Sequence, residues 1–182
     1  MAETAGGRSR RASERWVFVL QDQRNAGSCL VFKVDSLVCA LPIASVVETM
    51  RPLPVQRLDR APEMVLGLAM VRGLPTPVID AGRLLGAGTL AQPGRFISVA
   101  VGARRIALAV TSVWGIRAVS APSLQGIPAL LSRAETQAVA AIGALDQELL
   151  MVLHGVCLVP DSVFAASDRV AAPAPRAAVE VR

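Results

Sequence analysis

Residues 71–80 read Val-Arg-Gly-Leu-Pro-Thr-Pro-Val-Ile-Asp, and few other segments of the chain constrain the backbone so strongly. Proline has no N–H to donate to a sheet ladder, so Pro75 and Pro77 fit only a strand start, a bulge or an edge. Gly73 allows a sharp turn between two strands. Arg72 ends the preceding apolar run, where its stem is covered and its guanidinium is free for an anion or a partner. This segment therefore predicts two short strands joined by a tight turn.

Other strands are predicted by short runs of β-branched and aliphatic residues, broken by Gly, Pro and Asp. The predicted strand pairs are 29–34 with 37–41, 65–72 with 76–79, 96–101 with 105–110, and 139–145 with 149–153. Asp80 is a candidate N-cap for a helical turn that ends at Gly86. Helical spacing is also present at residues 43–47, and a short helix is predicted over residues 160–166.

The order of strand, turn and helix occurs twice along the chain. A shift of 67 residues places Ala40-Leu41 on Ala107-Leu108, and a shift of 74 places Val78-Ile79 on Val152-Leu153. We therefore predict an all-β fold with short helices, in which two tandem five-stranded SH3-like β-barrels pack side by side. We expect a disordered leader at 1–15 and a disordered tail at 168–182, with one ordered domain at 16–167 between them. Within this domain the barrels are expected at about 28–85 and 95–158, joined by a linker at 86–94. The segments at the two ends of the ordered domain can cross over, so that each contributes to the other barrel.

The formal charge of +5 is spread along the chain and does not gather in one basic region. Nucleic-acid binding requires a concentrated basic face, commonly with aromatic residues for stacking. A basic β-barrel that binds RNA or single-stranded DNA therefore remains only the alternative function. No apolar run reaches the roughly 18 residues of a membrane helix, and no signal-peptide pattern is present, so we expect a cytoplasmic protein without direct membrane insertion.

Catalytic and metal-binding patterns are not found in the sequence. Cys29, Cys39 and Cys157 lack metal-ligand spacing and lie among apolar residues, which is typical of buried thiols. His154 is the single histidine, which argues against a histidine-based metal site. No nucleophile–base pair or phosphate-binding loop is recognisable. We expect no enzymatic activity, no cofactor and no metal.

Several motifs together resemble the CheW-like adaptor family over about residues 28–166. The most specific is G-x-x-x-x-R-G-x-x-x-P-V-x-D, which runs from Gly67 to Asp80. The stretch 40–48 resembles the family's A-L-P-I-x-x-V-x-E pattern, and residues 142–153 resemble its final strands. Thr111 and His154 stand where the family commonly has Asp, so the second half is the less typical one.

This resemblance implies a scaffold that couples chemoreceptor tips to a CheA-type histidine kinase through the kinase's regulatory domain. It also implies that a groove between the barrels binds a helix of the receptor tip, with Val46, Val110, Val113 and Arg72 as the candidate contacts. Glu48 is a possible further interface residue. Core packing is the alternative role of each valine, and an internal bond to a carboxylate or to strand-end carbonyls is the alternative role of Arg72.

Overall fold

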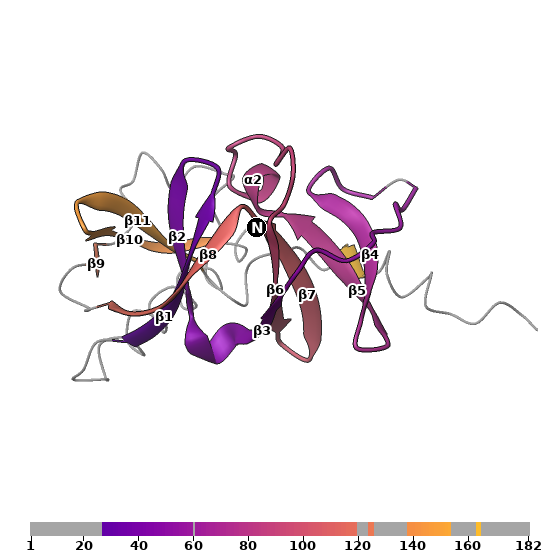
Figure 1. The fold of residues 1–182 in the computed structure, drawn as a ribbon, viewed down its shortest axis with the longest axis horizontal. Helices are drawn as coiled ribbons and strands as arrows, with labels where there is room; N and C mark the ends of the chain where they lie inside the picture. Colours follow the sequence, from indigo (N-terminus) through magenta and orange to yellow (C-terminus); the bar gives the residue numbers. More distant parts are fainter. Residues whose placement is uncertain (1–26, 60, 120–123, 126–137, 154–162, 165–182) are drawn as a thin grey trace, which may run out of the picture.

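The computed structural model describes residues 27–59, 61–119, 124–125, 138–153 and 163–164. Two β-sheets lie side by side (Figure 1). Sheet A has the order β8 (Ser112–Val119), β1 (Gly27–Val34), β2 (Leu37–Pro42), β11 (Glu148–Leu153), β10 (Val139–Leu145) and the two-residue β9 (Leu124–Gln125). Sheet B has the order β3 (Val46–Met50), β6 (Arg95–Val101), β7 (Arg104–Val110), β5 (Leu74–Asp80) and β4 (Val65–Val71). The two sheets confirm the predicted all-β fold.

The four predicted strand pairs are confirmed as antiparallel hairpins. The prolines of the β4–β5 hairpin lie near the start of β5, as predicted. Their positions precede the part of β5 that pairs with β7, which begins at Val78. A missing N–H at Pro75 or Pro77 therefore removes no bond from that parallel ladder.

The strands are not divided between the sheets at the predicted barrel boundaries of 28–85 and 95–158. Sheet B is formed by the continuous segment from β3 to β7, and sheet A by the segments on either side of it. The β1–β2 hairpin joins β8 and β11, whereas the β6–β7 hairpin lies between β3 and β5. Parallel pairs, β2 with β11 and β5 with β7, complete the sheets. Strands buried on both faces carry no alternation that identifies their neighbours, so the sequence left this pairing open.

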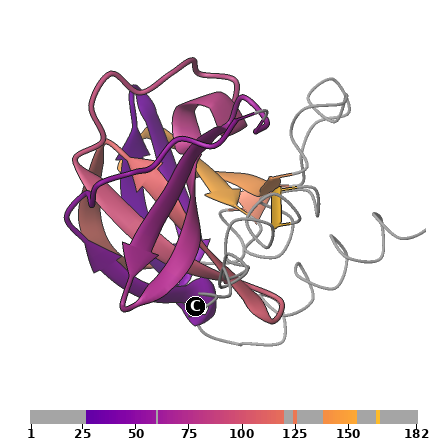
Figure 2. The same ribbon diagram turned by 90° about the vertical axis from the view of Figure 1, so that its right-hand side faces the viewer.

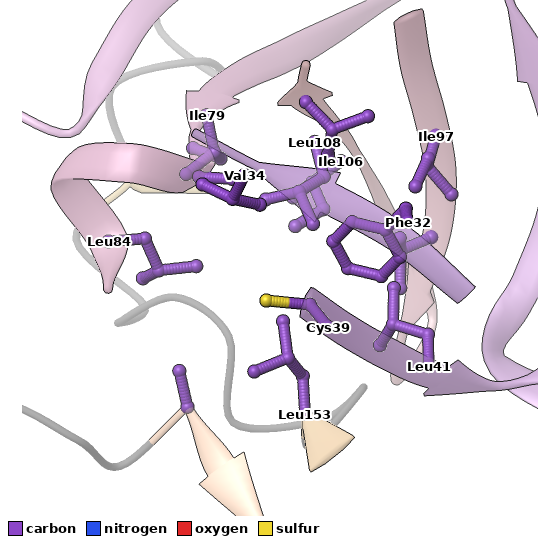
Figure 3. Packing of buried hydrophobic residues seen from close by; sticks show 14 of the residues in the cluster. Phe32, Val34, Cys39, Leu41, Ile79, Leu84, Ile97, Ile106, Leu108 and Leu153 are labelled. Atoms are coloured by element: carbon purple, nitrogen blue, oxygen red, sulfur yellow. The ribbon is translucent and has the colours of Figure 1, made fainter. Parts of the chain in front are cut away.

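A shared apolar core lies where the two sheets face each other (Figure 3). Phe32 and Leu41 from sheet A pack there with Ile97 and Leu108 from sheet B. Alternate residues of the same strands enter a second core on the far side of each sheet, such as Val31 in sheet A and the alanines of β7 in sheet B. Each sheet is therefore buried on both faces, which explains the nearly unbroken apolar runs of β1 and β7.

Asp80 is fully buried and caps the helical turn α2 (Ala81–Leu84), as predicted. Its Oδ1 accepts the Gly82 N–H at 2.8 Å and the Arg83 N–H at 3.3 Å. Its Oδ2 accepts the Leu90 N–H at 3.1 Å. Asp80 thus holds the loop after α2 against sheet B. Residues 86–94 connect two parts of this one sheet, so the prediction that they link the barrels is wrong.

The cysteines with described surroundings behave as predicted. Cys29 and Cys39 are buried and unpaired. Burial raises the pKa of Cys29 to about 11 and that of Cys39 to about 12. Both thiols therefore stay protonated near neutral pH and pack as small apolar side chains.

Two elements differ from the sequence prediction. Strand β8 was not predicted, because Gly115 and Arg117 interrupt its apolar pattern. The predicted helical spacing at 43–47 gives only a short 3-10 turn, η1 (Ile43–Ser45), before β3 begins. The predicted leader, the tail, Cys157 and His154 lie outside the described residues, as does the helix predicted at 160–166 except for 163–164, which are helical.

Candidate functional site

Arg72 lies at the tip of the β4–β5 hairpin. The turn consists of Arg72 and Gly73, which both have positive φ, 49° and 79°. Two such residues form the turn that matches the twist of a tight hairpin, and glycine is favoured there because it has no Cβ. The Arg72 side chain is 75% exposed. Its expected position at a strand end is confirmed, but a side chain this exposed does not have the covered stem that the sequence predicted.

The guanidinium of Arg72 makes a two-pronged ion pair with Glu48. Arg72 Nε donates to Glu48 Oε1 at 2.7 Å, and Arg72 Nη2 donates to Glu48 Oε2 at 2.6 Å. Glu48 belongs to β3 and Arg72 follows β4, the two outer strands of sheet B. The alternative of an internal bond to a carboxylate is therefore what the structure contains. This pair links β3 to the turn after β4, and a backbone bridge between Gln56 and Leu68 links the segment that follows β3 to β4.

The charges around Glu48 keep its carboxylate ionised. The hydrogen bonds from Arg72 have the largest effect and lower the pKa of Glu48; desolvation comes next and raises it, and the positive charges of Arg72 and Arg105 lower it by smaller amounts. An ion pair this exposed contributes little to the free energy of folding, because water screens it. Its geometric effect is clearer, since a planar guanidinium fixes the orientation of a carboxylate that it binds with two donors.

Val46 and Val113 lie where the two sheets meet. Val46 pairs with Val99 in sheet B, and Val113 pairs with Phe32 in sheet A. Both are partly buried against the shared core. They belong to edge strands, β3 and β8, which lie near the middle of the molecule in Figure 1. Their partial burial is compatible with both of the roles that the sequence left open.

Val110 is fully buried in the shared core. Its side chain points to the same face of β7 as Ile106 and Leu108, because alternate residues of a strand share a face. It cannot line a surface groove in this arrangement. The prediction that Val110 contacts a receptor is therefore wrong, and the alternative of core packing is correct.

The predicted residues do not form one cluster. The register places Val46 opposite Val99 of the shared core, and Glu48 opposite Ser98 on the other face of sheet B, because a bulge lies between the two pairs. The Arg72–Glu48 pair and the two valines at the meeting of the sheets are therefore distinct parts of the surface.

Sequence reasoning missed the most exposed apolar side chains of the two edge strands. Trp114 and Ile116 of β8 are 46% and 58% exposed, and Ile43 and Val47, next to and within β3, are 37% and 42% exposed. Together with Val46 and Val113 we call these residues the β3–β8 surface. The available signal was weak, namely the three apolar residues at 113, 114 and 116, because Gly115 and Arg117 interrupt the pattern of a strand.

Chemistry other than binding finds no support in this part of the molecule. Among the described residues there is no group of three or more His, Cys, Asp or Glu side chains that could hold a metal ion. No helix within the described ranges is long and apolar enough to span a membrane.

Comparisons with known proteins agree with the motifs. The model of the CheW-like domain matches residues 28–162. The fold is similar to the crystal structure of the scaffolding protein TtCheW from Thermoanaerobacter tengcongensis, with a TM-score of 0.66 and 22% sequence identity over 73% of this chain and 92% of that one. A search of curated proteins found no match. The family consists of non-catalytic scaffolds built from two SH3-like units, as expected from the sequence. Because the family model matches most of its length, this chain belongs to the CheW-like domain family.

Proposed function

We propose that this protein is a cytoplasmic chemosensory adaptor that couples the tips of chemoreceptors to a CheA-type histidine kinase. Family membership supports a role as a chemotaxis signalling adaptor. The observation that carries the finer proposal is the β3–β8 surface, because exposed apolar side chains occur on two edge strands that each pack a valine against the shared core. A receptor tip is helical, and an amphipathic helix binds such a surface through its apolar face.

The kinase binds elsewhere on the molecule in this proposal. Its regulatory domain resembles this fold and meets an edge or end of one of the sheets, which leaves the β3–β8 surface to the receptor. The shared core makes the two sheets one packed unit, because residues of both sheets interdigitate there. A shift of the receptor helix is then transmitted to the kinase as a small displacement of the whole adaptor.

Titration of Ile116→Glu with a receptor-tip fragment tests the proposal. A buried carboxylate has no partner on an apolar helix face, so we expect at least about tenfold weaker receptor binding. Binding of the kinase regulatory domain changes less than about threefold. Leu149→Glu is the matched control, because Leu149 is 61% exposed on β11, far in strand order from β8.

Two results would contradict the proposal. One is equal loss of receptor binding in Ile116→Glu and Leu149→Glu, which would mean that the β3–β8 surface is not the receptor site. The other is a steeply salt-dependent gel shift with a random oligonucleotide and no binding to receptor or kinase, which would favour the RNA or single-stranded DNA function.

A further inference from the structure

Among the residues that the structure describes, the outer side of β4 is paired at one position. Gln56 N–H donates to the carbonyl of Leu68 and Leu68 N–H donates to the carbonyl of Gln56, both at 2.8 Å. Alternate residues of a strand direct their backbone groups to the same side, so the N–H and C=O of Met70 also point outward. The next residue of the opposing segment in this register is Pro54, which has no N–H to donate. Within the described part of the chain, no residue bonds the outer backbone groups of Met70.

An apolar hollow lies beside this unpaired backbone. Its volume is about 730 Å³, and Leu53, Pro54, Val55, Gln56, Leu68, Ala69, Met70 and Pro75 line it. All of these side chains except Gln56 are apolar. The Met70 side chain is 60% exposed at this site. The hollow has the size of a typical ligand site, and it borders an open strand edge. Figure 2 views the molecule from the side on which β4 lies.

Two exposed arginines flank, along the chain, the segment that lines one side of the hollow. Arg51 precedes the lining segment 53–56 and Arg57 follows it, and both are exposed. Neither arginine forms an ion pair with another described residue. Asp59 is the nearest acidic residue along this loop. The rim therefore favours carboxylates over cations.

We propose that the open edge of β4 is a strand-addition site for an extended segment of a partner protein in which apolar residues alternate with carboxylates. The added strand bonds to the free N–H and C=O of Met70, and its apolar side chains enter the hollow. Its carboxylates lie near Arg51 and Arg57. Unpaired backbone groups at a strand edge are a template for another strand, which makes an extended peptide a better fit than a helix. A second copy of this edge would bring like charges together, so it fits less well.

The test uses the full-length protein and a capped peptide of alternating valine and glutamate, about six residues long. We expect binding with a Kd below about 1 mM, and changes in the amide resonances of Leu68 and Met70. The same peptide with N-methylated valines cannot donate to the strand, and we expect at least about tenfold weaker binding. A valine–lysine peptide should also bind at least about tenfold more weakly, because of Arg51 and Arg57.

Variants of the protein locate the site. Met70→Glu introduces a carboxylate into the hollow, and the valine–glutamate peptide should bind at least about tenfold more weakly to it. Leu149→Glu changes a residue of nearly equal exposure on sheet A, 61% against 60%, and should bind as the parent does.

Four outcomes would overturn the proposal. The first is unchanged affinity of the N-methylated peptide, and the second is unchanged affinity of Met70→Glu for the parent peptide. The third is a dimer of the free protein that Met70→Glu dissociates, because the edge would then serve self-association. The fourth is tighter peptide binding after removal of residues 168–182, because the chain's own tail would then be the occupant. None of these results bears on receptor binding at the β3–β8 surface, so the two proposals fail separately.

Discussion

Sheet B joins its two outer strands to each other, whereas the described part of sheet A leaves β8 with large apolar side chains in solvent. The ion pair between Arg72 and Glu48 links β3 to the turn after β4, and the bridge between Gln56 and Leu68 links the segment after β3 to β4. On β8, Trp114 and Ile116 are 46% and 58% exposed. Exposed apolar residues on an edge strand promote unwanted association, so an edge left uncovered carries a risk of aggregation.

The difference indicates a division of roles between the sheets. Sheet B forms a continuous segment of the chain and satisfies most of its edges internally, with β4 beyond Leu68 as the exception. Sheet A is assembled from segments on both sides of that unit, and β8 forms one of its edges. A partner that covers β8 therefore binds at an edge strand of sheet A. The following predictions test how far the two sheets act separately.

The largest loss of stability is expected in the core that the two sheets share. Phe32 is fully buried in the shared core, and Phe32→Ala leaves a cavity between the sheets. We expect a loss of about 3–5 kcal/mol in the free energy of unfolding. Because both sheets contribute to this core, chemical denaturation should remain a single transition. Two separate transitions in the variant would show that the sheets are independent folding units.

A smaller effect, confined to sheet B, is expected at Asp80. Asp80→Ala leaves the N–H groups of Gly82, Arg83 and Leu90 without their acceptor, at a cost of about 2–3 kcal/mol. Asp80→Asn retains one acceptor oxygen, so its free energy of unfolding should fall by less than that of Asp80→Ala. Hydrogen exchange shows where the stability is lost: the amides of α2 and of the following loop should lose protection before those of β1 and β2. Equal loss in both sheets would contradict the assignment of Asp80 to sheet B.

The sequence predicted the positions of the strands better than it predicted which strands pair with each other in the sheets. The hairpins and the Asp80 cap depend on local signals, namely apolar runs, turn residues and a side chain that accepts from the first helical N–H groups. The partition of strands between sheets depends on parallel pairs such as β5 with β7, which leave no local signature. The same limit explains Val110, because apolar character alone does not distinguish a shared core from a surface between barrels.

The candidate site shows this limit most clearly. The Arg-Gly turn placed Arg72 correctly, but its partner Glu48 is 24 residues away and was considered only as a separate interface residue. Trp114 and Ile116 were overlooked because β8 has mixed polarity. Exposure of an edge strand is a property of the assembled sheet, so composition alone could not identify it.

A charge reversal at Arg72 tests whether the Arg72–Glu48 ion pair of sheet B also contributes to receptor binding. Arg72→Glu places two carboxylates together, and we expect roughly 30-fold weaker binding of the receptor tip. Binding of the kinase regulatory domain should change less than about threefold. The double variant with Glu48→Arg restores an ion pair of opposite polarity. If the pair acts by positioning β3, the double variant recovers receptor binding, and if Arg72 contacts the receptor directly, it does not.

Equal loss of both partners in Arg72→Glu, or an unfolded variant by circular dichroism, would contradict a role of Arg72 in receptor binding. Either result would leave it as a structural residue of the β4–β5 hairpin. The comparison would then sharpen, because the ion pair would serve only sheet B and the receptor contact would rest on the β3–β8 surface.

The smallest effect is the pH dependence of the Arg72–Glu48 pair. The pKa of Glu48 is lower in the folded protein than its ordinary value, mainly because of the hydrogen bonds from Arg72. A lowered folded-state pKa means that the pair stabilises the protein above the ordinary glutamate pKa, near 4.3, and that this contribution is lost as the pH falls through the folded value.

Glu48→Gln removes the charge at every pH. The midpoint of thermal unfolding should therefore be slightly lower in the variant at pH 7, by a few degrees at most, and this difference should shrink in acid. High salt at pH 7 should also reduce it, because the pair is exposed to solvent. A difference that stays constant from neutral to acidic pH would show that Glu48 stabilises sheet B by its packing and not by its charge.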